Sequence, residues 1–233
     1  FGLAFDFKWT NKNLFYGIYD RSVSLWQNTD MAARALPNEV EQELLQSIKG
    51  KVPSAIRTTV YLPPGEGKPL RKNLRRAAKR LKQAGWKIID GKLTDKNGDV
   101  LEIEILTFSP VFERILAPII KNLKRLGIQA NIRIVDTAQY TFRMQTFDFD
   151  VTTAAFGTSA TPGITEKNFW GSAAAKQEGG LNYSGLQDPV IDQLLERIAQ
   201  APDRQSLTLA ARTLDRVLLA NHYIIPEWFN ASH

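Results

Sequence analysis

Apolar and polar residues alternate along residues 101–107, which is the two-residue period of a strand with one covered face. The apolar positions are Leu101, Ile103 and Ile105, and Glu102 and Glu104 stand between them. Beyond this strand the apolar spacing changes to three and four residues, the spacing of one helical face. The residues on that face are Phe112, Ile115, Leu116, Ile119, Ile120, Leu123 and Leu126.

The ends of this helix are marked by residues that commonly cap helices. Ser109 can accept a hydrogen bond from an unpaired backbone N–H of the first turn, and Pro110 suits the first helical position. Gly127 supplies a left-handed residue that ends the helix. Pro118 lies inside the pattern, where a proline removes one backbone hydrogen bond. We therefore expect a bend at Pro118 and not a break.

A second strand is predicted at residues 128–135, and a right-handed crossover would make it parallel to the first. Asp136 and Gln139 resemble a capping pair for a short helix that ends at Met144. Residues 147–155 then predict a third strand. These elements indicate an α/β fold, in which ligands are expected at the loops that follow the strands.

The rest of the chain is organised around this central unit. Residues 1–100 are predicted to hold helices and a loop-rich connection, residues 101–155 the central unit, and residues 156–233 a ligand-binding loop and the C-terminal helices. Within the first segment, Trp86–Ile89 and the turn Asp95–Asp99 predict a hairpin, because its Asn-Gly pair suits a two-residue turn.

The net charge of +6 is concentrated in one amphipathic helix. Its apolar stripe is Leu70, Leu74, Ala77, Ala78 and Leu81, and Gly85 ends it. Its cations are Arg71, Lys72, Arg75, Arg76, Lys79, Arg80 and Lys82, which contribute +7 and leave about −1 (6 − 7) for the rest. We expect a solvated face, with binding of a polyanion or an anionic membrane surface through residues 71–82 as the alternative. Nucleic acid is not expected as a partner, because no aromatic residues interleave with the cations.

Two loops are candidates for ligand binding. The first follows the predicted third strand and is rich in glycine, serine and threonine, although an ordinary turn would explain it equally well. Its candidate residues are Phe156, Gly157, Thr158, Ser159, Thr161, Pro162 and Gly163. The second loop runs from Asp20 to Pro37, where Trp26 is the one aromatic residue and, in a polar neighbourhood, could form a ligand wall.

Catalytic chemistry has little support in the sequence. The absence of cysteine excludes disulfides and thiolate sites. The two histidines, His222 and His233, are not spaced as metal ligands, so neither a metal nor a cofactor is expected. Asp148 and Asp150 lie two residues apart on a predicted strand and could serve a hydrolase-like enzyme. A solvent-facing strand edge explains them as well, and we do not expect an enzyme.

The first residues suggest that the chain is a piece of a longer protein. No apolar run approaches the length of a membrane span. The first ten residues lack the basic head and the cleavage site of a signal peptide. We therefore expect the chain to have been cut from a longer polypeptide.

Seven stretches carry a resemblance to a known family. They are FGLAFDFKWTNKNLFYGIY, SLWQNTDMAARALP, NLRRAAKRLKQAGW, FERILAPIIKNLKRLGI, RIVDTAQYTFRMQTFDFDV, NFWGSAAA and LDRVLLANHYIIPEW. In this order they resemble the extracellular solute-binding proteins of family 5, the peptide and nickel class. The resemblance is greatest to the YejA-type branch, which is linked to uptake of oligopeptides and microcin C by ABC importers.

The resemblance implies a fold and a biological setting. The fold would be a lobe of the type II periplasmic-binding-protein kind, a mixed sheet with helices on both faces. Residues 1–233 would form one lobe of a two-lobe receptor, sharing a ligand cleft with the remaining lobe. The implied ligand is an oligopeptide, or a modified peptide such as microcin C. The implied partners are the permease subunits of an ABC transporter, and the implied location is the periplasm.

The resemblance also implies ligand contacts. Phe156 would be an aromatic wall, and Thr158 and Ser159 would be polar contacts, with Pro162 and Gly163 shaping the turn. A second patch in the early loop would comprise Tyr19, Arg21, Ser24, Trp26 and Asn28.

One feature departs from the family pattern. Many relatives carry an arginine just before the aromatic residue, whereas Thr152–Ala155 stand there in this chain. A clamp for a ligand carboxylate would therefore have to come from Arg21 or Arg143.

Overall fold

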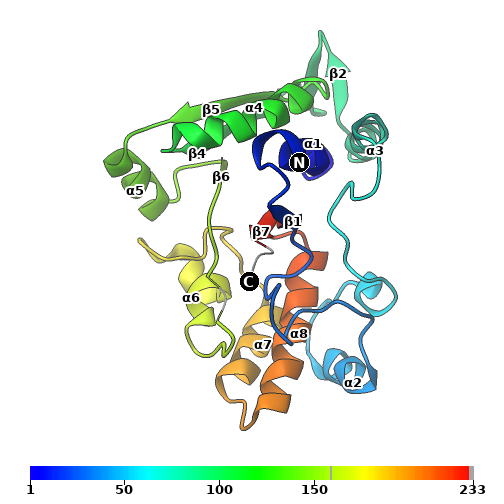
Figure 1. Cartoon of the computed structure of the whole chain (residues 1–233), viewed down its shortest axis with the longest axis vertical. Coiled ribbons are helices and arrows are strands. Elements are labelled where there is room, and N and C mark those ends of the chain that lie inside the picture. The colour runs from blue at the N-terminus through cyan, green and yellow to red at the C-terminus, as the bar shows by residue number, and fades with distance from the viewer. Residues whose placement is uncertain (158, 231–233) are drawn as a thin grey trace. The chain divides into compact units, whose positions relative to one another are not determined.

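The structure is a computed structural model that describes residues 1–157 and 159–230. Its contacts divide the chain into two compact units, whose elements are labelled in Figure 1. Unit 1 contains Phe1–Asp20, Pro64–Ala154 and Asn230, and unit 2 contains Arg21–Pro63 and Ala155–Phe229. Each unit is therefore assembled from segments that are distant in the sequence.

Unit 1 is built on a three-stranded parallel sheet with the order β5-β4-β6. The strands are β4 (Glu102–Thr107), β5 (Gln129–Ile134) and β6 (Val151–Thr152). Ile105 is fully buried in the central strand and lies opposite Ile132 on one side and Val151 on the other. Helix α4 (Pro110–Lys124) packs against β4 and β5 (Figure 1). The predicted parallel strand, helix, strand unit is confirmed.

The predicted ends of α4 are confirmed in part. Pro110 occupies the first helical turn, and Gly127 has a φ of +84°. A side chain at Gly127 would also meet the backbone nitrogen of Leu93 at 2.9 Å, so only glycine fits there. The predicted side-chain cap is wrong, since Ser109 makes no capping hydrogen bond. The helix runs through Pro118 without a break, as expected.

The segment after β5 differs from its prediction in one respect. The short helix α5 (Thr137–Gln145) is capped as expected, because Asp136 accepts a hydrogen bond from the Gln139 N–H at 2.8 Å. The predicted third strand is much shorter than residues 147–155. Phe147 takes a left-handed φ of 55° at the end of α5, and this backbone cannot continue as a strand.

The other elements of unit 1 flank this sheet in the sequence. They are α1 (Phe7–Leu14), the basic helix α3 (Leu70–Gln83), β2 (Lys87–Ile89) and β3 (Lys92–Thr94). Strands β2 and β3 form an antiparallel hairpin, but its turn is Asp90-Gly91, where both φ angles are positive. The Asn-Gly pair predicted to make this turn instead makes the next one, at Asp95–Asp99.

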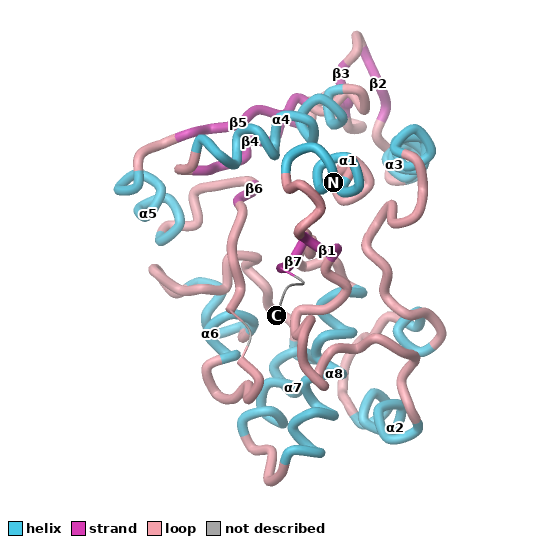
Figure 2. The backbone as a smooth tube through the Cα atoms, in the orientation of Figure 1, coloured by secondary structure: helices cyan, strands magenta, loops and turns pink. Residues whose placement is uncertain are grey.

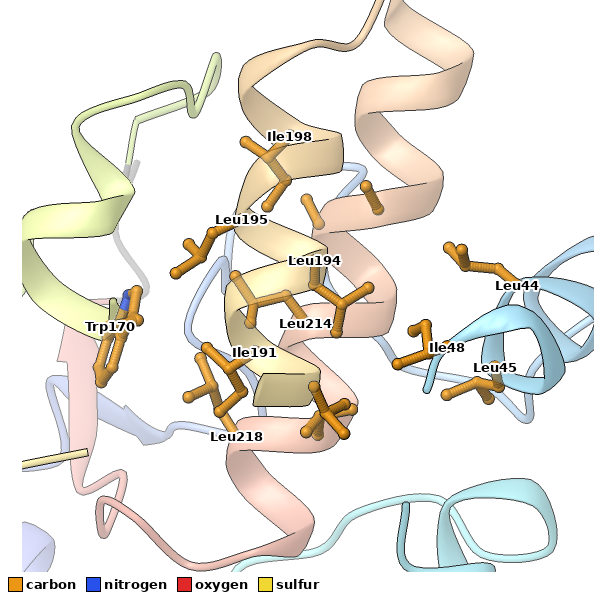
Figure 3. Packing of buried hydrophobic residues seen from close by; sticks show 14 of the residues in the cluster. Leu44, Leu45, Ile48, Trp170, Ile191, Leu194, Leu195, Ile198, Leu214 and Leu218 are labelled. Atoms are coloured by element: carbon orange, nitrogen blue, oxygen red, sulfur yellow. The ribbon is translucent and has the colours of Figure 1, made fainter. Parts of the chain in front are cut away.

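Unit 2 is mainly helical. Its elements are α2 (Glu39–Ser47), the short helix η1 (Ser54–Arg57), α6 (Glu166–Trp170), the short helix η2 (Ser172–Lys176), α7 (Pro189–Ala199) and α8 (Arg204–Ala220). Ile191, Leu194 and Leu214, from α7 and α8, have no exposed surface and form the centre of its core. Figure 3 shows Leu45 of α2 and Trp170 of α6 in the same cluster. Such dense apolar packing supplies most of the stability of a helical unit.

Two further strands span points in the sequence at which the chain passes from one unit to the other. They are β1 (Tyr19–Arg21) and β7 (Trp228–Asn230), which form a two-stranded sheet. After β1 the chain enters a long segment without helix or strand, drawn as a loop between β1 and α2 in Figure 2.

The predicted α/β class is confirmed. The antiparallel β2-β3 pair lies in a sheet separate from the parallel strands. The division into residues 1–100, 101–155 and 156–233 does not coincide with the two units, because each unit is discontinuous in sequence. That residues 1–233 form one lobe of a larger protein stays a prediction.

Candidate functional site

The predicted ligand loop in unit 2 is anchored by an aromatic cluster. Phe156 is half-buried, packs against the core and stacks on Trp170, with ring centroids 5.2 Å apart and an interplanar angle of 28°. The Phe169 ring meets the Phe156 ring edge-on, with ring centroids 6.2 Å apart. Stacked and edge-on pairs fix ring orientation. Phe156 therefore has a defined position at the start of the loop.

The loop beyond Phe156 presents backbone and hydroxyl groups to solvent. Gly157, Ser159 and Thr161 are exposed, Gly163 is partly exposed and Pro162 is buried. The Ser159 hydroxyl accepts a hydrogen bond from the Thr161 N–H at 3.0 Å, which gives this segment a local turn. Thr158 lies outside the described residues.

A buried carboxyl group lies in the same helix as Trp170. Glu166 is 7% exposed, and burial raises its pKa. A hydrogen bond from the Trp170 side chain opposes that shift. The sequence reasoning did not single out Glu166.

The early loop has a different character from its prediction. Trp26 is only 1% exposed and belongs to the core of unit 2, so the expected polar neighbourhood is wrong. Its indole nitrogen has no hydrogen-bond partner among the described residues. Ser24 is also buried, and its hydroxyl accepts a hydrogen bond from the Trp26 N–H at 2.9 Å. Asn28, by contrast, is exposed.

The remaining residues of that patch are occupied within the protein. The Tyr19 ring packs edge-on against Phe15 at 4.9 Å, and its backbone exchanges hydrogen bonds with the Asn11 side chain. The Arg21 guanidinium is 7% exposed and forms an ion pair with Glu227 at 2.5 Å. Burial raises the pKa of Glu227 to about 7, and Arg21 opposes that shift. Arg21 is therefore engaged by a carboxylate of its own chain.

The second candidate for a carboxylate clamp is engaged in the same way. Arg143 in unit 1 forms ion pairs with Glu104 at 2.8 Å and with Asp148 at 2.9 Å. Both arginines predicted as possible clamps are therefore paired with carboxyl groups within the chain.

Helix α8 carries an anchoring network that the sequence reasoning missed. The Arg204 guanidinium forms an ion pair with Asp30 at 2.5 Å and donates a hydrogen bond to the Ala160 carbonyl. It thereby connects the early loop, which contains Asp30, to the ligand loop, which contains Ala160. Arg212 adds a hydrogen bond to the Asp30 carbonyl at 2.6 Å. This network brings the two predicted loops together within unit 2.

A buried carboxylate completes the attachment of the early loop to α8. Asp215 has no exposed surface and accepts hydrogen bonds from the Leu25 N–H at 2.8 Å and the Ala33 N–H at 3.0 Å. Arg216 pairs with buried Glu41 and donates to the Ala35 carbonyl. The one sequence signal for this network is the four-residue spacing of polar residues along the helix. These residues are Arg204, Thr208, Arg212 and Arg216.

The alternative catalytic pair has structural partners. Asp150 accepts a hydrogen bond from the Glu104 N–H at 2.9 Å, and Asp148 pairs with Arg143. Both residues precede β6, so the prediction that they share one face of a strand is wrong.

Two further features of the described part of the chain bear on metal binding and on membrane insertion. There, no group of His, Asp and Glu side chains has the arrangement of a metal site. His222 is exposed with a left-handed φ of 57°, and His233 lies outside the described residues. In residues 1–157 and 159–230, no helix has the length and apolar character that crossing a bilayer requires.

Comparison with known sequences relates the chain to one family of binding proteins. Residues 1–177 match the family described as bacterial extracellular solute-binding proteins, family 5 Middle. The chain is 43% identical over 229 residues to the probable peptide-binding protein YejA of Agrobacterium fabrum. This match covers 97% of this chain and 37% of that protein. It is 37% identical over 235 residues to the uncharacterized protein YejA of Escherichia coli, covering 98% and 38%. The chain thus spans less than two fifths of the length of these curated relatives.

Comparison with solved structures concerns the fold. The oligopeptide-binding protein AppA from Bacillus subtilis, solved in complex with a nonapeptide, has a TM-score of 0.71 to this chain. The two are 16% identical, and the match covers 98% of this chain and 40% of AppA.

Proposed function

The chain belongs to the bacterial extracellular solute-binding proteins of family 5, and we propose that it is the ligand-binding lobe of a receptor for oligopeptides. Membership of this family confirms the resemblance drawn from the sequence. In the proposal, the lobe shares a cleft with the remaining lobe of a longer protein. That protein works in the periplasm and delivers its ligand to the permease subunits of an ABC importer.

One observation carries the proposal. The segment after the stacked Phe156, in which Gly157, Ser159 and Thr161 are exposed, is tied by Arg204 to the early loop. Its peptide groups and hydroxyls can form hydrogen bonds with the backbone of an extended peptide, while Phe156 offers an apolar contact. A pre-positioned loop loses little conformational entropy when it binds a ligand.

The ion pairs of Arg21 and Arg143 bear on how the peptide would be recognised. Because Arg21 and Arg143 are both paired with carboxyl groups of their own chain, neither is expected to clamp the ligand carboxylate. Recognition through the peptide backbone accepts many side chains, and it also accommodates modified peptides such as microcin C. The relatives named above as binding proteins offer no support for an enzyme based on Asp148 and Asp150.

The proposal is tested by calorimetry with penta-alanine. This chain should bind penta-alanine more weakly than the longer protein that contains it, because burial of ligand surface by both walls makes a cleft tight. Acetylated penta-alanine amide should bind this chain as well as the free peptide does. Phe156→Ala should weaken binding about tenfold, which corresponds to roughly 1.4 kcal/mol.

Phe142→Ala is the matched control, because Phe142 is an exposed phenylalanine in unit 1, outside the proposed site. It should leave the affinity unchanged, and circular dichroism should show both variants folded. Equal affinities of this chain and the longer protein would contradict a shared cleft. Equal losses in the two variants would contradict a role for Phe156.

A further inference from the structure

An open groove of about 470 Å³ lies in unit 1, along α3 and beside the end of α4. Its apolar lining is contributed by Leu70, Leu74, Ala78 and Leu126. Its charged lining is contributed by Arg71, Arg75 and Arg125, and none of the described residues that line it is acidic. None of the described residues proposed to bind peptide lines the groove.

The positive charges of the groove arginines are not paired with acidic groups among the described residues, and most of their hydrogen-bond donors are unused. Arg71 and Arg75 are exposed and stand four residues apart, so they are neighbours on one face of α3. Within the described part of the chain, neither side chain has a hydrogen-bond or ion-pair partner. Arg125 makes one side-chain hydrogen bond, to the Asn122 oxygen at 3.3 Å. Like charges placed this closely repel one another, and a bound anion would relieve that repulsion.

The leucines of the groove indicate that the ligand also has an apolar part. Leu74 and Leu70 are only partly buried, although they belong to the apolar stripe of α3. The volume of the groove lies in the range of small-molecule sites, which combine a mainly apolar lining with a few polar or charged groups. Guanidinium groups bind carboxylates and phosphates through paired hydrogen bonds. The groove therefore combines an apolar floor with a cationic rim.

We propose that this groove binds an amphiphilic anion. The alkyl chain lies against Leu70, Leu74 and Leu126, and the carboxylate or phosphate headgroup pairs with Arg71, Arg75 and Arg125. Two sources share this chemistry, a free fatty acid and an anionic phospholipid.

The test is calorimetry of this chain with decanoate below its micelle concentration. Decanoate should bind, while acetate, which lacks the alkyl chain, and decyl maltoside, which lacks the charge, should bind at least about tenfold more weakly. Arg75→Gln should weaken decanoate binding about tenfold, because it removes a charged hydrogen-bond donor. Leu74→Ala should also weaken decanoate binding and leave the response to acetate unchanged.

Arg80→Gln is the matched control. Arg80 is an exposed arginine of the same helix and does not line the groove. If Arg75→Gln and Arg80→Gln weaken decanoate binding equally, the attraction is diffuse charge and the proposal is overturned. Absence of decanoate binding, or equal binding of decyl maltoside, would also overturn it.

Vesicles of phosphatidylcholine with and without phosphatidylglycerol separate the two sources. Binding to the anionic vesicles that Arg75→Gln abolishes and Arg80→Gln spares would identify a membrane lipid as the source. Decanoate binding without vesicle binding would identify a free amphiphile, and either result supports the groove. Decanoate binding that this chain shows and the longer protein lacks would mean that another part of that protein fills the groove, which would overturn a ligand site.

Discussion

In unit 1, strands β4 and β5 pair over six consecutive residues from Glu102 to Thr107, so backbone groups satisfy one another. In unit 2, residues 22–37 form no helix or strand. Their backbone is held by side chains of α8, chiefly Asp215, Arg212 and Arg216. A backbone ladder does not depend on the identity of any one side chain, whereas a loop anchored in this way does. Single polar residues should therefore matter more in unit 2.

The largest effect is expected from Asp215→Ala. The substitution removes the acceptor of two backbone N–H groups, those of Leu25 and Ala33, and leaves them in the interior without a partner. Each unsatisfied group costs about 1–3 kcal/mol, so the free energy of unfolding should fall by about 4 kcal/mol. Denaturant unfolding measures the loss, and hydrogen exchange at Leu25 and Ala33 locates it.

Asp99→Ala provides the control in unit 1, where Asp99 is an exposed turn residue. Its effect should stay within about 0.5 kcal/mol. If hydrogen exchange rose equally across β4 and the early loop in Asp215→Ala, the loop would not depend on this anchor in particular.

A smaller effect is expected from Ile105→Ala in the centre of the parallel sheet. Ile105 is fully buried, and removing its side chain leaves a cavity that costs about 3 kcal/mol. The backbone ladder remains, so amide protection should fall in unit 1 and persist at Leu25. Ile134→Ala, at a position that is 41% exposed, should cost less than about 1 kcal/mol. Denaturant unfolding of the two variants measures the loss of stability, and amide exchange shows whether protection falls in unit 1 and persists at Leu25.

The smallest effect is a pH dependence. Burial raises the pKa of Asp215 to about 6, while its hydrogen bonds and the charge of Arg216 oppose the shift. Because the folded-state pKa lies above the ordinary value of 3.8, the stability linked to this group is present below that value and is lost as the pH rises through 6. Asp215→Asn should remove this fall, on the order of 2 kcal/mol. Unfolding measured between pH 4 and 7 tests it, and a constant difference between wild type and variant would contradict it.

The elements of unit 1 could be predicted from sequence because their signals are local. The alternation around Ile105 and the helical spacing around Ile119 each lie within one element, and both were read correctly. The hairpin turn was misplaced since Asp90-Gly91 and Asn97-Gly98 are equally good turn pairs. Only pairing between strands selects one of them.

The interior of unit 2 could not be predicted in this way because its contacts join distant segments. Trp26 was placed in a polar environment on the evidence of its neighbours in sequence. Its burial comes instead from the helical core that includes α7 and α8. Likewise Asp215 bonds to Leu25 across 190 residues, a separation that leaves no local pattern.

The location of the candidate site stays a prediction, and the structure bears on the partners of its charged residues. Phe156 and the residues after it were identified as a ligand loop, and their role stays a prediction. The pairing of Arg21 with Glu227 and of Arg143 with Glu104 was not foreseen. A sequence shows which charges are present but not which of them neutralise each other.

The interleaved makeup of the two units has a practical consequence. The polypeptide passes between them after Asp20, Pro63, Ala154 and Phe229. No single protease cut can release either unit, and neither can be produced as one uninterrupted gene fragment. Separating them for study would require rejoining their segments through new linkers in an altered order.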